Sequence, residues 1–419
     1  MTADVAIDEL NISSVEFWRR TNRARDEVFS VLRRERPVSY HAPMSFGLAG
    51  MAAPMIPGFW AITSYDAVRT VSRNPEVFCS GAGALLDDIA LPQDMREQVG
   101  SFLVMDGQRH SSLRRMVSRA FTPKQLARVE SQIADQAKRV VDHLLEVGDC
   151  DFVQEVSTPM PLWTISEMVG IPEEDRAELV AAANALFASS DPGFLDDGMD
   201  AFTRFLEATQ QIWQSAVDLA DARRRAPQDD LMSALVEAEV DGETLTDGEI
   251  GAFMLLLMSA GTDTTRTTIN HTMKAFCDHP DQRQLLLTDL DAGLPTAVEE
   301  FLRWATPIIH MRRTATHDTD LGGQSIRAGD HLVMFYESAN HDEGVFDDPW
   351  RFDVARQPND HLAFGGGGPH HCLGAHLART QLRCVFRELL LRAPNLQVGP
   401  PEYLTSYFTN GITTMPCTL

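Results

Sequence analysis

The chain has 419 residues, of which 44% are hydrophobic and 23% charged, a composition typical of a folded globular protein. Its formal net charge of −24 disfavours nucleic acids and anionic membranes as general partners, because their phosphate groups would be repelled. The longest apolar run, near residues 253–258, is too short to span a bilayer, and the N-terminus lacks the features of a secretory signal. We therefore expect a cytoplasmic, monomeric protein without a membrane span or a nucleic-acid partner.

The first part of the chain predicts a mixture of short helices and strands. Residues 1–14 are expected to be a flexible tail, and residues 15–419 a single domain. Apolar spacing predicts a helix over 15–36 that ends before Pro37, and then a strand over 38–41. A second strand over 58–63 leads into a helix from Tyr65. The Met-, Gly- and Pro-rich segment 42–60 is either a loop folded on the core or a hydrophobic lip around a substrate entrance.

From residue 121 to about 240 nearly every segment has helical periodicity, interrupted by Pro123, Pro172, Pro192 and Pro227. The remaining short β segments fall mainly after Pro307, so we expect a mainly α fold with a minor β region. Near the C-terminus, Asn410-Gly411 stands between two β-prone runs and predicts a type I′ hairpin.

A long central helix is predicted from the capping box formed by Thr246 and Glu249. Apolar residues at helical spacing continue towards Pro280, a length on the order of 50 Å. Its middle carries AGTDTT, residues 260–265, where glycine and threonines weaken helical hydrogen bonding. The residues alone leave open whether this is a kink or a place for the acid Asp263 and the alcohol Thr264.

Two pairs of charged residues share helix faces. Glu300 and Arg303 in EEFLRW are three residues apart, and His110 and Arg114 are four apart, so each pair is cofacial. Such pairs more often decorate a solvated surface. Together with two further residues, the second pair makes a set of N–H donors that suit carboxylates. The set consists of His110, Arg114, Arg313 and His370.

The stretch FGGGGPHHCLGAHLAR, residues 364–379, carries one cysteine, Cys372, between a glycine run and a predicted helix. A thiol at a helix N-terminus is biased towards thiolate and serves either as a metal ligand or as a nucleophile. The six cysteines of the chain form no C-x-x-C pair, which argues against a disulfide framework and a zinc ribbon. One open alternative is a zinc site. Its ligands would be His370, His371, Cys372 and His376.

These motifs, in this order, resemble those of a bacterial cytochrome P450 over nearly the whole chain from about Glu16 onward. The cysteine loop and AGTDTT carry most of this resemblance, and DDPWRFD (residues 347–353) adds to it. The resemblance implies a single α-rich body with a long central helix and small β-sheets. Phe364 lies eight positions before Cys372, one more than in most members, which resembles actinobacterial enzymes that oxidise sterols and branched lipids. Trp350 occupies a position at which members of this family frequently have a carboxylate.

The resemblance also implies roles for individual residues. Cys372 would be the thiolate ligand of the iron in haem b, and Asp263 and Thr264 would relay protons for the activation of dioxygen. The haem propionates would be bound by His110, Arg114, Arg313 and His370. A structural ion-pair network would comprise Glu300, Arg303 and Arg351. The substrate pocket would include Leu256, Ser259, Ala260, Ile308, Ile309, Phe408 and Thr409.

The function implied is a haem-dependent monooxygenase that hydroxylates an aliphatic C–H bond of a hydrophobic substrate: a lipid, branched-chain fatty acid, sterol or terpenoid. The alternatives are a macrolide or other secondary-metabolite hydroxylase, and a non-catalytic haem-binding protein. No flavin or nicotinamide fingerprint is visible, so electrons from NAD(P)H would arrive through a ferredoxin and its reductase. A basic patch on the helix after Cys372 would receive the ferredoxin. It consists of Arg379, Arg383, Arg387 and Arg392.

Overall fold

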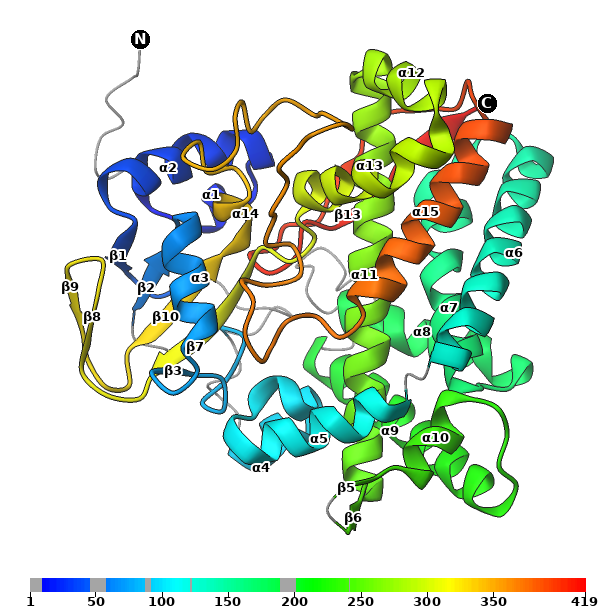
Figure 1. Ribbon diagram of the computed structural model, residues 1–419, viewed down its shortest axis with the longest axis horizontal. Helices are drawn as coiled ribbons and strands as arrows, with labels where there is room; N and C mark the ends of the chain where they lie inside the picture. The colour runs from blue at the N-terminus through cyan, green and yellow to red at the C-terminus, as the bar shows by residue number, and fades with distance from the viewer. Residues whose placement is uncertain (1–9, 46–57, 87–91, 121–122, 189–200, 241) are drawn as a thin grey trace.

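A helix of 32 residues, α11 (Asp247–Asp278), runs through the helical half of the molecule (Figure 1). Thr246 and Glu249 form the expected capping box at its N-terminus, and the helix continues without interruption past residues 260–265. The computed structural model describes residues 10–45, 58–86, 92–120, 123–188, 201–240 and 242–419. The prediction of a long central helix is therefore confirmed.

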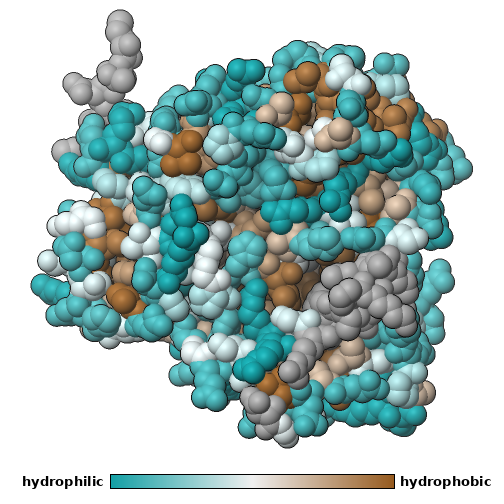
Figure 2. Space-filling view, viewed as in Figure 1, coloured by the Kyte–Doolittle hydropathy of each residue, from teal (hydrophilic) through white to brown (hydrophobic). Residues whose placement is uncertain are grey.

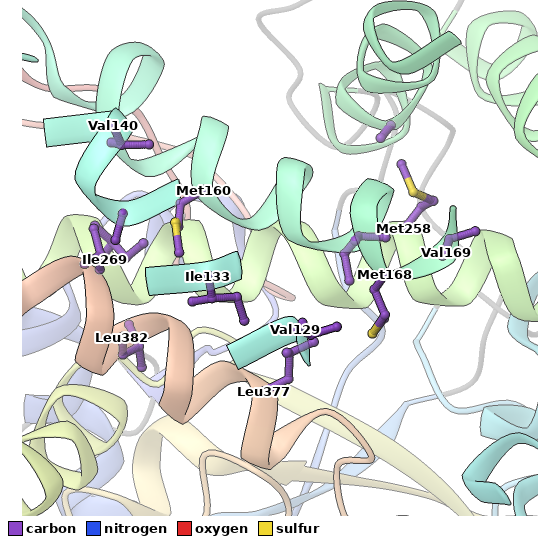
Figure 3. Close-up of a cluster of buried hydrophobic side chains, with 14 of the residues drawn as sticks. Val129, Ile133, Val140, Met160, Met168, Val169, Met258, Ile269, Leu377 and Leu382 are labelled. Atoms are coloured by element: carbon purple, nitrogen blue, oxygen red, sulfur yellow. The ribbon is translucent and has the colours of Figure 1, made fainter. Parts of the chain in front are cut away.

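Several helices pack directly around α11. Those in contact with it include α7 (Pro159–Val169), α9 (Ala201–Arg225), α13 (Leu290–Ala305) and α15 (Ala375–Arg392), and α15 in turn packs along α6 (Pro123–Val147). Figure 3 shows apolar side chains of α6, α7, α11 and α15 meeting in one buried cluster. Among them are Ile133, Met160, Ile269 and Leu382. This core fixes the helix that carries Asp263 relative to the helix that follows Cys372.

Further helices surround this core or pack against the β-sheet region. They are α3 (Tyr65–Arg73), α4 (Gln93–Gly100), the 3₁₀ helix η4 (Ser101–Val104), α5 (Gly107–Ala120), the π-helix η5 (Val153–Ser157), α8 (Glu173–Ala188), α10 (Leu231–Glu237), α12 (Pro280–Thr288) and α14 (Tyr336–Ala339).

A five-stranded sheet lies on the other side of the molecule (Figure 1). Its order is β1 (Val38–His41), β2 (Phe59–Ile62), β10 (His331–Phe335), β7 (His310–Ala315) and β3 (Phe78–Cys79), with only β2 and β10 parallel. A three-stranded sheet joins β11 (Gln397–Val398), β14 (Pro416–Thr418) and β4 (Cys150–Asp151). The two-stranded pairs are β5 (Glu239–Val240) with β6 (Glu243–Thr244), β8 (Thr319–Leu321) with β9 (Gln324–Ile326), and β12 (Glu402–Tyr403) with β13 (Ile412–Thr414). The prediction of a mainly α fold with small sheets is confirmed.

The N-terminal segment differs from the sequence prediction in two ways. The single helix expected over 15–36 is split into α1 (Val15–Trp18) and α2 (Asn22–Glu35), because the Thr21 side chain caps a new helix by accepting from the N–H of Ala24. The expected flexible tail is wrong for residues 10–14, since Ile12 is fully buried and its carbonyl accepts from the Trp18 indole. Residues 1–9 lie outside the described part, and the single domain over 15–419 stays a prediction.

The Met-, Gly- and Pro-rich segment 42–60 lies mostly outside the described residues, which omit 46–57. On the side shown in Figure 2, hydrophobic residues appear near the middle of the molecule and also in patches at its upper right and left, with hydrophilic residues between them. No helix in the described ranges has the length and apolar character required to cross a bilayer.

The expected type I′ hairpin at Asn410-Gly411 is wrong. That turn requires positive φ at both residues, and neither residue is among the described positions with positive φ. The Asn410 side chain instead accepts from Arg25 and donates to the carbonyl of Thr306. Strand β13 pairs with β12 and not with a run next to the turn. Tertiary hydrogen bonds of Asn410 therefore replace the local turn.

Because it contains buried histidines, we expect the protein to lose stability in mild acid. Burial lowers the pKa of His310 to about 4, although its Nδ1 bonds the Tyr407 carbonyl at 2.7 Å. An unfolded histidine titrates near pH 6.5, so the stabilisation is present above that pH and is lost as the pH falls towards 4. We expect a His310→Gln variant to show a dependence of unfolding free energy on pH that is weaker by about 1 kcal/mol per pH unit.

The measurement is urea unfolding between pH 7 and 4.5, with the exposed His317→Gln variant as control. An unchanged slope in His310→Gln would show that His310 does not fold in its neutral form.

Candidate active site

One face of α11 is accessible although the helix is central. Ala260 is exposed, and Leu256 and Thr264, four residues to either side, are half-buried, so this face borders a solvent-accessible space. The Thr264 hydroxyl donates to the Ala260 carbonyl at 2.8 Å, and the Ser259 hydroxyl donates to that of Leu256 at 3.1 Å. These bonds hold both hydroxyls beside the helix without interrupting it.

Asp263 lies beside this face and is only 4% exposed. Its Oδ1 accepts from Arg266 Nη2 at 2.5 Å, one helical turn away. The Arg266 side chain is itself 17% exposed. The pair therefore links a buried carboxylate next to Thr264 with the solvent-accessible side of the same helix.

A cluster of nitrogen donors gathers His110 of α5 and His370 of the cysteine loop, whose ring centroids are 4.3 Å apart. Burial lowers the pKa of His110 to about 4, and the charges of His370, Arg114 and Arg313 add to the effect. Burial, together with the charges of Arg313 and Arg114, also lowers the pKa of His370. Arg114 donates to the carbonyl of His371, the neighbour of His370, and Arg313 is close enough for its charge to act on both histidines, so the four donors expected from the sequence lie together. We call them the donor cluster.

The donor cluster is short of acceptors. His110 Nε2 and both ring nitrogens of His370 are buried without a hydrogen-bond partner, and no salt bridge to Arg313 is found among the described residues. Burial lowers the pKa of Arg313, which records the cost of enclosing its charge. The nearest carboxylate, Asp106, lies 3.8 Å from His370 but also accepts from the backbone N–H groups of Ser80 and Gly81. Buried polar groups in this state need hydrogen-bond partners, and the buried charge of Arg313 favours an anionic one.

The glycine run before Cys372 packs against α3. Ser72 Oγ donates to the Gly367 carbonyl at 2.7 Å, and Arg73 Nε donates to that of Gly366 at 3.1 Å. A Cβ on Gly368 would lie 2.5 Å from the Ser72 carbonyl oxygen, and this glycine also has a φ of +80°. The element that approaches the glycine backbone is therefore a helix of the protein itself.

Cys372 stands just before α15, whose N-cap is Gly374, and its N–H donates to the Phe364 carbonyl at 3.0 Å. The residue is exposed to solvent, but the surrounding protein partly desolvates its thiol. This burial raises the pKa of Cys372, against the opposing effects of the Gly374 N–H, Arg114 and Arg379. The expected bias towards thiolate is therefore wrong for the polypeptide alone. A bound metal ion would deprotonate the thiol.

The zinc alternative is not supported by the geometry. His376 Nε2 lies 2.8 Å from Glu130 of α6, and His370 faces His110, so these side chains diverge from Cys372. Within the described ranges, no three His, Cys, Asp or Glu side chains are grouped to hold a metal ion.

The buried ion-pair network has a different third member from the one expected. Glu300 and Arg303 are both fully buried and joined by two hydrogen bonds of 2.8 Å. Arg356 Nε donates to Glu300 at 3.1 Å. Arg351, expected in this place, is 61% exposed and lies 3.8 Å from Asp353.

The loop geometry explains the difference. Arg356 Nη2 donates to the Arg351 carbonyl at 2.7 Å, so Arg351 contributes its backbone while its side chain points to solvent. The neighbouring Trp350 donates to Asp26 at 2.6 Å and stacks on His341 with ring centroids 4.0 Å apart. The sequence DDPWRFDVAR contains both arginines, and spacing from the resemblance selected the wrong one.

Sequence reasoning also missed Glu299, the neighbour of Glu300. Burial opposes its ionisation, but hydrogen bonds from Arg379 at 2.7 Å and from His361 lower its pKa to about 2. The Arg379 guanidinium lies 4.6 Å from the ring centroid of Phe364. Through Arg379, Glu299 thus ties α13 to the N-terminal part of α15 and to Phe364, the residue that begins the cysteine loop.

Most arginines of the basic patch expected on α15 form ion pairs with carboxylates of other helices, so the patch is less basic than the sequence of α15 indicates. Arg379 pairs with Glu299, Arg387 with Asp291 at 3.0 Å, and Arg392 with Asp142. These carboxylates come from α13 and α6, which the sequence does not show to be neighbours of α15. Arg383 donates to the neutral hydroxyl of Thr380 at 3.1 Å.

The expected pocket residues fall into two groups. Leu256, Ser259 and Ala260 lie on α11, as described above. Ile308 bridges Thr409, and the N–H of Ile309 donates to the Phe408 carbonyl at 2.8 Å, so these four residues are held together.

Comparison with known proteins agrees with these features. The family model described as Cytochrome P450 matches residues 61–296 and 292–393. The chain is 42% identical over 419 residues to the methyl-branched lipid omega-hydroxylase of Mycobacterium tuberculosis, covering 99% of this chain and 96% of that protein. It is 37% identical over 394 residues to the steroid C26-monooxygenase of Mycolicibacterium smegmatis, covering 92% of this chain and 88% of that protein.

Among solved structures, the Mycobacterium marinum cytochrome P450 CYP268A2 in complex with pseudoionone superposes with a TM-score of 0.92. The two chains are 48% identical, and 100% of each is covered. The chain therefore belongs to the cytochrome P450 family of monooxygenases, with haem-thiolate iron as cofactor and dioxygen as co-substrate.

Proposed function

We propose that Cys372 is the haem ligand of this monooxygenase and that the enzyme hydroxylates an aliphatic C–H bond of a lipid-like substrate. The observation that carries the assignment of the site is the donor cluster, His110, Arg114, Arg313 and His370, next to Cys372.

The residues present fit a haem. The donor cluster would hold the haem's two propionates, with His110 Nε2 and the buried Arg313 among the groups that would gain a partner. A soft thiolate suits iron, and Cys372 is accessible to solvent and follows His371, whose carbonyl accepts from Arg114 of the donor cluster. The Glu299–Arg379 pair would hold the start of α15 and thereby the position of this sulfur. Haem, when bound, supplies the chemistry that activates dioxygen.

The protein's part in the reaction would be to deliver protons and to exclude bulk water. Thr264 lies on the accessible face of α11, where its hydroxyl would hold a water molecule while it donates to Ala260. Asp263 is buried next to it and would exchange protons with solvent when its contact with Arg266 opens. The ion pair with Arg266 keeps the carboxylate in place between turnovers.

An Asp263→Asn variant is expected to lower kcat by about 10²-fold, because an amide cannot accept and release a proton in this position. The dissociation constant of the substrate, followed by the Soret shift, should stay within about twofold, since Asp263 is buried and its carboxylate is paired with Arg266. Steady-state turnover and spectral titration measure the two effects separately. A large change in substrate affinity with unchanged kcat would contradict the proton-relay role.

The substrate class is proposed from the pocket and the relatives together. Six of the seven expected pocket residues are Leu, Ile, Ala, Phe or Thr, and only Ser259 adds a further hydroxyl, which is bonded to Leu256. Apolar walls with few polar groups suit a ligand bound mainly by burial of hydrocarbon. The relatives at 42% and 37% identity are named for methyl-branched lipids and for steroids. We therefore propose a methyl-branched lipid, steroid or terpenoid as substrate.

The test is a binding screen that follows the low-spin to high-spin Soret shift, with product identification by mass spectrometry. Methyl-branched fatty acids, sterol ketones and terpenoid ketones are expected to bind and to be hydroxylated on an aliphatic carbon. Response to macrolides alone would overturn the proposal.

Two other functions have less support. A macrolide hydroxylase is suggested by a structure of the P450 MycG with mycinamicin IV, but this match has 29% identity and a TM-score of 0.80, below the lipid-directed relatives in identity. A non-catalytic haem protein has no need for the buried Asp263 beside Thr264.

We further propose that a ferredoxin and its reductase deliver the electrons. Because three of the four arginines expected to attract it are paired, Arg383 is the candidate contact on α15. An Arg383→Glu variant is expected to slow reduction by ferredoxin about tenfold at low salt, whereas Arg34→Glu, on the exposed side of α2, should not. Stopped-flow reduction compares the two variants, and equal rates would exclude this docking site.

The cytoplasmic location and the monomeric state of the protein stay predictions.

A further inference from the structure

Two cysteines face each other in the three-stranded sheet that ties the end of the chain to its middle. Cys417 of β14 is the register partner of Cys150 of β4, and their Sγ atoms are 3.5 Å apart. Both are free thiols. Neither residue belongs to the haem site or to the expected pocket.

The backbone geometry at this pair suits a disulfide. Directly opposed residues of antiparallel strands have Cα atoms about 4.5 to 5.5 Å apart, inside the range of about 4.4 to 6.8 Å found for disulfides. The sulfur atoms need to approach by roughly 1.5 Å, which side-chain rotation can supply. Strand β14 is central, with β11 on its other side, so the strand is held while the side chains rotate.

The third cysteine near this sheet is engaged elsewhere. Cys277 at the end of α11 accepts from the N–H of Val398 on β11 at 3.4 Å. It lies on the β11 side of β14, whereas Cys150 lies on the β4 side. Cys150 is therefore the partner available to Cys417.

We propose that Cys150 and Cys417 form a reversible disulfide when the protein meets a peroxide. Hydrogen peroxide oxidises the Cys150 thiol to a sulfenic acid and releases one water. The Cys417 thiol then attacks the sulfenic sulfur, the S–S bond forms and a second water leaves. The two thiols lose two electrons and two protons in total, and the peroxide is reduced to water.

Accessibility sets the order of these steps. Cys150 is half-buried and open to a small oxidant, whereas Cys417 is only 2% exposed. Burial raises the pKa of Cys150, and burial together with the adjacent Cys150 raises that of Cys417 to about 12. Oxidation is therefore slow at neutral pH and faster at pH 8 to 9. Thiols of high pKa are also poor leaving groups, so the disulfide, once formed, exchanges slowly.

The bond would join residues 267 positions apart in the chain. It would fix β14 to β4, which directly precedes the π-helix η5 and α7. Closing so long a loop restricts the unfolded chain, so the oxidised protein should unfold at a temperature about 3 to 8 °C higher.

The experiment uses the holoenzyme, treated with hydrogen peroxide at pH 8.5, quenched with catalase, alkylated and digested without reductant. We expect a peptide pair linking Cys150 to Cys417, a loss of two titratable thiols, and reversal by dithiothreitol. Cys150→Ser and Cys417→Ser should abolish the linked pair, and Cys277→Ser should retain it. Peroxide-treated Cys150→Ser is the reference for the thermal shift, because haem damage is then common to both samples.

Three results would overturn the proposal: Cys150 oxidised to sulfinic acid with Cys417 still alkylated, a linkage to another cysteine or another chain, or no linked pair after Cys150 has reacted. The mass-spectrometric readout does not depend on haem ligation or on substrate, so it stands apart from the proposed function.

Discussion

A Cys372→Ser variant is expected to lose monooxygenase turnover by about a thousandfold or more. Serine keeps the size of the side chain but replaces a soft sulfur ligand by a hydroxyl that does not ionise near neutral pH. The thiolate is the ligand whose electron donation favours cleavage of the O–O bond, so its loss removes the chemical step and not only cofactor affinity. Product formed per bound haem, with a saturating supply of electrons, separates these two effects.

Cys384→Ser is the matched control, because Cys384 is half-buried on α15, the helix that follows Cys372, and is not a candidate ligand. It should retain turnover within about twofold. Wild-type turnover per haem in Cys372→Ser would remove Cys372 from the mechanism.

Replacing Arg303 by alanine is expected to lower the free energy of unfolding by about 3 to 5 kcal/mol. The change leaves Glu300 fully buried with a charge that Arg356, at 3.1 Å, only partly balances. It also removes the N–H groups that donate to the carbonyls of Asn340 and Pro349, so the loop from 340 to 349 loses this link to α13. Urea unfolding followed by circular dichroism measures the loss, and haem content of the purified protein gives a second readout.

The matched control is Arg351→Ala. Because this side chain is 61% exposed and 3.8 Å from its only salt-bridge partner among the described residues, the change should cost less than about 0.5 kcal/mol. Arg356→Ala should lower the free energy of unfolding by an amount similar to that of Arg303→Ala. Equal losses for Arg351→Ala and Arg303→Ala would contradict the assignment of Arg356 to the network.

Local signals were sufficient for the elements that are long or clearly bounded. The capping box at Thr246 and the apolar spacing after it predict α11 because both act within the helix itself. The strand at 38–41 has the same bounds in the structure, since Pro37 ends the preceding segment. The hairpin at Asn410-Gly411 failed because Arg25, far away in the sequence, binds the Asn410 side chain.

In the candidate site too, some features were predicted correctly and others were not. The grouping of the donor cluster with Cys372 was implied by the family resemblance, and the structure places His110 against His370 and Arg114 on the carbonyl of His371. Arg351 was assigned by its place in a motif, but whether Arg351 or Arg356 reaches Glu300 depends on the path of the loop. The charge of α15 was misjudged for a related reason, since Glu299, Asp291 and Asp142 approach it from other helices. Pairing between distant segments is not written in local sequence.

The absorption spectrum of the reduced wild-type protein under carbon monoxide tests the assignment of Cys372 most directly. Thiolate ligation predicts a strongly red-shifted Soret band that is absent in Cys372→Ser and present in Cys384→Ser. A Soret band at the position typical of histidine ligation, or a purified protein that binds no haem, would contradict the account.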